Sequence, residues 1–112
     1  MARHPLIVVR TAFVALAAAL AWSACKRTEM ASAAQCEKLL DEYIDLKLSE
    51  DPRARAMSSE DRAALRGKIA TEALTDSDVR QVKTQCETEV TEAEYKCATL
   101  ARTSKAWNDC IE

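Results

Sequence analysis

The five cysteines are the residues of this chain whose type and spacing most restrict their chemistry. They are Cys25, Cys36, Cys86, Cys97 and Cys110. Four cysteines can bind zinc, but zinc sites normally use close pairs of the CxxC type, and the last four cysteines are separated by gaps of 49, 10 and 12 residues. Widely spaced cysteines suit disulfides instead. We therefore predict disulfides, no metal site and no cofactor.

Most residue types used in catalysis are missing after the first 24 residues. The only histidine is His4 and the only glycine is Gly67. Catalytic triads, HExxH metal sites and glycine-rich phosphate loops therefore have no counterpart in the rest of the chain. Carboxylates remain, but Asp41 and Asp45, four residues apart, are expected to form a solvated helix face. We expect that the protein is not an enzyme.

Residues 1–24 have the composition of a signal peptide. Arg3 and Arg10 are basic, and no acidic residue precedes Glu29. Residues 11–24 form an apolar run of 14 residues, which suits a signal sequence better than a membrane span. The alternative is an uncleaved anchor extended by residues 6–9, which would place Arg10 inside the bilayer.

The end of this run, Ser23-Ala24-Cys25, resembles the lipobox of bacterial lipoproteins, although Trp22 stands where leucine is usual. The resemblance implies that Cys25 receives a diacylglyceryl group, becomes the N-terminus and anchors the protein in a membrane. Lys26 in place of aspartate implies the periplasmic face of the outer membrane. Ordinary signal peptidase sites at 19–21 and 31–33 are the competing cleavage positions.

The cysteine count favours lipidation, because an even number remains once Cys25 is modified. Four cysteines in an exported small domain predict two disulfides. Cys97 and Cys110 flank a turn that can bring them together, which leaves Cys36 with Cys86, so this pairing is preferred. Cys86 with Cys97, and Cys36 with Cys110, is the rival pairing.

The mature chain is predicted to be all-α, a small disulfide-stapled bundle of four to five short helices. Apolar residues recur at spacings of three or four after Ser, Thr or Asp caps. The first helix is expected over 33–49, and Pro52 ends it before a short turn capped by Asp51. Later helices are expected from Ser58 or Ser59 to about Leu74, from the caps at 75–78, from Thr91, and from Thr103 or Ser104.

The predicted organisation is a signal peptide (1–24), a lipidated cysteine with a tether (25–33) and a helical domain (34–112). The inner faces are expected to carry the cysteines. In the fourth helix that face would hold Ala93, Cys97, Leu100 and Ala101. In the last segment Trp107 is expected to pack in the core beside Cys110.

Charge excludes one class of partner and leaves others open. Residues 25–112 hold all 18 acidic residues and 14 of the 16 basic residues, a formal charge of −4, so nucleic-acid binding is not expected. Arg53 and Arg55 are candidates for contact with lipid head groups. The glutamates at 87, 89, 92 and 94 are expected to surround a solvated turn.

Two functions fit these observations. The preferred one is a lipid-anchored envelope protein that binds an unknown envelope protein without catalysis. The alternative comes from CEKLL at the start of the first helix, with Cys86 about fifty residues later. This arrangement resembles the acid-activated HdeA-type chaperones, which implies a periplasmic stress chaperone, although two additional cysteines depart from that pattern.

Overall fold

The computed structural model describes residues 28–111, so the signal peptide, its cleavage and the lipidation of Cys25 lie outside the described residues. This part of the chain is all-α, as predicted. Its elements are α2 (Ala33–Glu50), the 3-10 helix η1 (Pro52–Ala56), α3 (Ser59–Ala73), α4 (Ser77–Glu89), α5 (Glu92–Thr99) and α6 (Ser104–Cys110). Among the described residues, no helix is long and apolar enough to cross a membrane.

Each α-helix begins at a side-chain cap, which satisfies backbone N–H groups that have no partner within the helix. The capping residues are Ser32, Ser58, Asp76, Thr91 and Thr103. At α2 and α5 the cap is reciprocal, since Gln35 and Glu94 accept from the backbone of Ser32 and Thr91. All five starts were predicted within two residues, because caps are local features of sequence.

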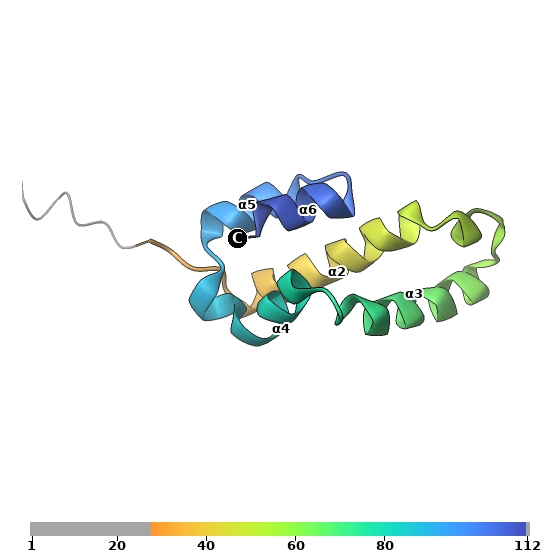
Figure 1. Ribbon diagram of the computed structural model, residues 1–112, viewed down its shortest axis with the longest axis horizontal. Helices are drawn as coiled ribbons and strands as arrows, with labels where there is room; N and C mark the ends of the chain where they lie inside the picture. Colours follow the sequence, from red (N-terminus) through yellow and green to blue (C-terminus); the bar gives the residue numbers. More distant parts are fainter. Residues whose placement is uncertain (1–27, 112) are drawn as a thin grey trace, which may run out of the picture.

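Helix α2 is the central element, and it packs against η1 and all four other α-helices (Figure 1). The α5–α6 pair lies on one side of α2 and α4 on the other. Helix α3 runs back along the distal half of α2. Residues 44–69 thus form a two-helix projection, closed by η1, which we call the arm.

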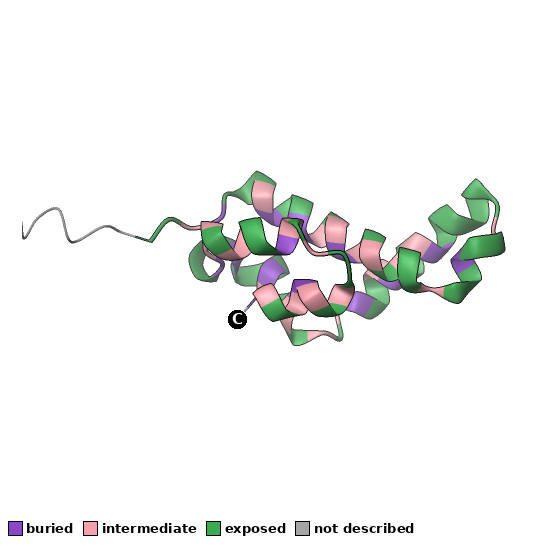
Figure 2. Ribbon diagram, turned by 90° about the horizontal axis from the view of Figure 1, so that it is seen from above, coloured by how far each residue is buried: buried purple, intermediate pink, exposed green. Residues whose placement is uncertain are grey.

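The core consists of two clusters of buried residues that follow one another along the length of α2 (Figure 2). The main cluster joins α2, α4, α5 and α6, and its largest fully buried side chains are Trp107, Leu39, Ile111, Val82 and Val90. A smaller cluster fills the arm, where the buried residues Ala54, Leu65 and Ile69 pack with Ile44, Leu48 and Met57. The arm therefore has its own apolar contacts.

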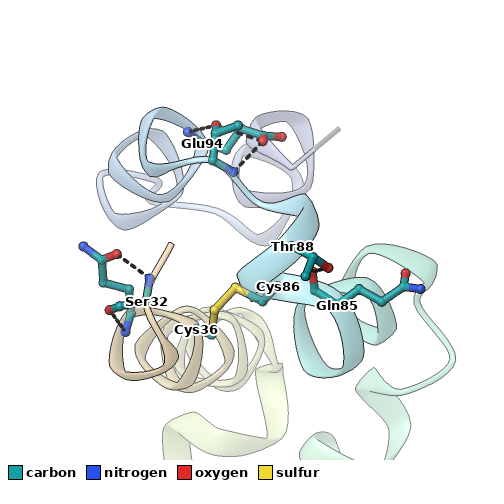
Figure 3. Close-up of a disulfide and its surroundings, with 8 residues drawn as sticks. Ser32, Cys36, Gln85, Cys86, Thr88 and Glu94 are labelled. Atoms are coloured by element: carbon teal, nitrogen blue, oxygen red, sulfur yellow. Dashed lines mark hydrogen bonds between the residues drawn. A yellow bond between two sulfur atoms is a disulfide. The ribbon is translucent and has the colours of Figure 1, made fainter. Parts of the chain in front are cut away.

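Two disulfides link the helices. Cys36 of α2 bonds Cys86 of α4 with their Cα atoms 5.9 Å apart (Figure 3), and Cys97 of α5 bonds Cys110 of α6 with their Cα atoms 5.7 Å apart. Both distances are typical of disulfides. This is the pairing that was preferred from the sequence. The turn between α5 and α6 brings Cys97 and Cys110 together, which leaves Cys36 with Cys86.

The prediction for the inner face of α5 was wrong. Ala98 is the buried residue of this helix, whereas Ala93, Cys97 and Leu100 are exposed. Helix α5 has only eight residues, so its period is poorly determined by sequence. The expectation that every paired cysteine is buried therefore fails at Cys97.

The segment expected to be a tether is partly fixed to the domain. Met30 and Thr91 form an isolated antiparallel bridge, with the N–H of Ala31 donating to Val90 O and the N–H of Glu92 donating to Glu29 O, each at 2.9 Å. Ala31 is buried in the main core. From Glu29 onward the chain therefore belongs to the helical domain.

Candidate functional site

The carboxylates that the sequence singled out on α2 form ion pairs at the surface. Arg66 Nε donates to Asp45 Oδ1 at 3.0 Å, and Arg66 Nη2 lies 3.5 Å from Asp41 Oδ1. Both carboxylates are exposed, in agreement with the expected solvated face. Across residues 28–111, no three Cys, Asp or Glu side chains gather in a way that would hold a metal ion.

The glutamates around the α4–α5 turn have separate roles. Glu87 and Glu89 are exposed, and Glu94 caps α5. Glu92 lies 3.4 Å from Lys96 and also meets Glu29 across the isolated bridge. The hydrogen bond and repulsion between the two carboxyls raise the pKa of Glu29, while the same hydrogen bond and Lys96 lower the pKa of Glu92.

Tyr43 and Trp107 form the aromatic centre of the main core. Their rings are 4.7 Å apart, inclined at 55°. Tyr43 Oη donates to Asp76 Oδ2 at 3.1 Å, and burial together with this carboxylate raises the pKa of Tyr43 to about 12. The phenol thus stays protonated and holds α2 to the start of α4. Trp107 has the core role that the sequence predicted.

The two connector arginines differ in their contacts. Arg53 Nη2 donates to Asp51 Oδ2 at 2.7 Å, and the contacts with Arg53 lower the pKa of Asp51 to about 2. The Arg53 side chain is therefore paired with Asp51, the residue that caps η1. Arg55 is exposed and makes no ion pair or side-chain hydrogen bond with the described residues.

Arg55 lies at the edge of a groove on the arm. Two hollows, of about 300 Å³ and about 370 Å³, share Leu48 and Arg62. Leu48 and Met57 supply apolar surface, while Arg55, Arg62 and Arg66 supply charge. We call this feature, defined by these five residues, the basic groove.

The basic groove was not predicted from the sequence, apart from Arg55. The groove forms where α2, η1 and α3 meet, so no local pattern marks it. Arg62 and Arg66 stand four residues apart on α3, and this spacing is the one signal that would have placed them on a shared face. Arg62 Nη2 donates to Ala54 O at 2.8 Å, which fixes its side chain against η1.

Comparison of the chain with protein-family models, curated proteins and solved structures gives no match. The basic groove combines a small apolar surface with three guanidinium groups, of which Arg66 is already paired with carboxylates. Such a surface can bind carboxylates by charge-assisted hydrogen bonds.

Proposed function

We propose that this protein is an envelope lipoprotein, anchored through Cys25, that binds a protein with an acidic surface and performs no catalysis. The observation that carries the proposal is the basic groove on the arm, with Arg55 unpaired among the described residues. Export to an oxidising compartment is supported by the two disulfides, which are rare in the cytosol. Lys26 favours the periplasmic face of the outer membrane.

The position of the groove suits an anchored binding protein. Glu29, where the chain joins the domain, is four positions after Cys25, so the lipid would lie within about 14 Å of that end. Helix α2, with 18 residues, extends about 27 Å from there toward the arm. In Figure 1 the arm points away from the end where residue 28 enters. The basic groove would therefore be accessible beyond the membrane surface.

The chemistry of the groove indicates the kind of partner. Arg55 and Arg62 are exposed, and Asp45 is the acidic residue beside them, already paired with Arg66. Leu48 and Met57 are half-buried and offer an apolar contact. A segment with carboxylates around an apolar side chain would complement this surface. Lipid phosphates would be the competing anions, and a binding test must separate the two.

The anchor is tested by mass spectrometry of the protein extracted from membranes. We expect an N-terminal peptide that begins at Cys25 and carries a diacylglyceryl group, with loss of membrane association in Cys25→Ala. An unmodified N-terminus at Trp22 or Ala34 would contradict the proposal.

Binding is tested by crosslinking in envelope preparations, with Arg55→Glu compared to Lys83→Glu. Lys83 is an exposed cation of α4 outside the groove, so Lys83→Glu changes net charge equally. We expect an acidic protein to be captured by wild type and Lys83→Glu, with binding to Arg55→Glu at least fivefold weaker, about 1 kcal/mol. Equal capture by all three, or binding only to anionic vesicles, would reject the groove as a protein-binding site.

The Cys36–Cys86 disulfide, which joins residues 50 positions apart, favours the HdeA-type alternative. Acid activation requires the fold to open at low pH. Suppression of the aggregation of an unfolded client at pH 2–3, with no such activity at pH 7, would support the chaperone over the binding protein.

A further inference from the structure

The two disulfides differ in their accessibility to other molecules. Cys36 and Cys86 are only 8% and 4% exposed, whereas Cys97 is exposed and Cys110 is half-buried. Thiol–disulfide exchange requires a thiolate to reach a sulfur atom, so exposure decides which bond can react. The Cys97–Cys110 bond is the accessible one.

An apolar side chain stands beside the accessible disulfide. Leu100 is 81% exposed, and among the described residues it is the one large hydrophobic side chain that is exposed. It follows Cys97 by three positions, at the end of α5, where its N–H donates to Cys97 O at 3.2 Å. A protein that approached this disulfide would therefore meet Leu100 as well.

We propose that Cys97–Cys110 is a site of thiol–disulfide exchange with a protein dithiol, and that Leu100 is an apolar contact for that protein. The proposal goes beyond the binding function and does not depend on the basic groove. It names a second surface, formed by the α5–α6 pair, and a second class of partner.

The reaction proceeds in two displacements. A partner thiolate attacks Cys97 Sγ, the Cys97–Cys110 bond breaks, and Cys110 leaves as a thiolate that takes up a proton. The partner is then joined to Cys97 by a mixed disulfide. A second partner thiolate attacks the partner's own sulfur, which releases Cys97 as a thiolate. The partner dithiol is thereby oxidised to a disulfide, and the Cys97–Cys110 disulfide is reduced to two thiols.

The fold explains why Cys97 is the sulfur attacked. Cys110 is half-buried, and its sequence neighbours Trp107 and Ile111 are fully buried, whereas Cys97 is exposed on α5. Because Trp107 and Ile111 hold α6 in the main core, the bond can open without release of the helix.

The test uses the purified protein with both disulfides formed. It is treated briefly with reduced thioredoxin as a protein dithiol or with dithiothreitol, then alkylated and mapped by mass spectrometry. We expect alkylation of Cys97 and Cys110 at least tenfold faster than alkylation of Cys36 and Cys86. Equal rates for the two disulfides, or earlier opening of Cys36–Cys86, would overturn the proposal.

The role of Leu100 and the sulfur that is attacked are tested separately. Leu100→Ser should slow the reaction with thioredoxin severalfold and leave the rate with dithiothreitol unchanged, while Ala93→Ser, another exposed position of α5, should change neither. An unchanged thioredoxin rate in Leu100→Ser would remove Leu100 from the site. Thioredoxin that lacks its second active-site cysteine should be trapped on Cys97, and trapping on Cys110 would reject the assigned direction of attack.

Discussion

At the scale of single residues, Trp107 has the largest role in the main core. Its side chain is fully buried against Tyr43, and its Nε1 has no hydrogen-bond partner among the described residues. A buried donor without a partner costs about 1–3 kcal/mol, which the apolar contacts of the ring must offset. The residue thus stabilises the fold by packing and not by hydrogen bonding.

Truncation of this side chain should be among the most damaging single changes. We expect Trp107→Ala to lower the free energy of unfolding by about 3–5 kcal/mol, because it leaves a cavity between α2 and α6. Trp107→Phe removes the unpartnered N–H and keeps a ring against Tyr43, so its loss should be about 1–2 kcal/mol. Urea unfolding followed by circular dichroism measures both, and equal losses would contradict this account.

Asp51 should give the stability a dependence on acid pH. Its pKa is lowered from 3.8 to about 2 by Arg53, so the folded state favours the charged form. The resulting stability is present above about pH 4 and is lost as pH falls toward 2. Asp51→Asn, which can still cap η1, should therefore be less stable than wild type at pH 7, and the difference should shrink as pH falls from about 4 through 2. A difference that stays constant over this range would assign the effect to capping alone.

At the scale of elements, the sequence predicted what local chemistry determines. Helix starts followed from caps such as Ser32 and Thr91, and the inner faces of the long helices followed from their apolar period. The bridge between Met30 and Thr91 could not be predicted from the sequence, because it consists of backbone hydrogen bonds that almost any residue can make. The basic groove was missed since its residues meet only after α3 folds back on α2.

Gly67 lies in the middle of α3, where glycine has a low helix propensity and lowers the stability of the helix. A Cβ added at Gly67 would meet no atom within 4 Å, so the helix does not approach a neighbour closely at this position. Gly67→Ala should therefore stabilise the protein by about 1 kcal/mol. Ala64→Gly, at another exposed position of the same helix, is the matched control and should cost a similar amount. Destabilisation by Gly67→Ala would reveal a contact at this position.

At the scale of the whole molecule, the α2–α3 pair connects the main core with the arm. The main core carries the accessible Cys97–Cys110 disulfide, and the arm carries the basic groove. The arm has few buried side chains of its own, so its position depends on α2 continuing from the main core into the arm. Stability of the main core therefore decides whether the basic groove is presented at all.

The Cys36–Cys86 disulfide should be the more important of the two for this stability. It joins residues 50 positions apart and encloses the whole arm, whereas Cys97–Cys110 joins residues 13 apart. Chain entropy predicts losses of about 4 and about 3 kcal/mol when each is removed. Cys36 and Cys86 are also buried, so Cys36→Ala/Cys86→Ala adds the cost of small cavities.

We therefore expect Cys36→Ala/Cys86→Ala to approach complete unfolding at 25 °C, since domains of this size are stable by only about 5–10 kcal/mol. Cys97→Ala/Cys110→Ala should remain folded, because Trp107 and Ile111 still hold α6 in the core. Urea titration of both variants, with the slope of the transition compared to wild type, gives the two losses. If the variant without Cys97–Cys110 were the less stable, the α5–α6 pair would depend on its disulfide, and exchange there would unfold the domain.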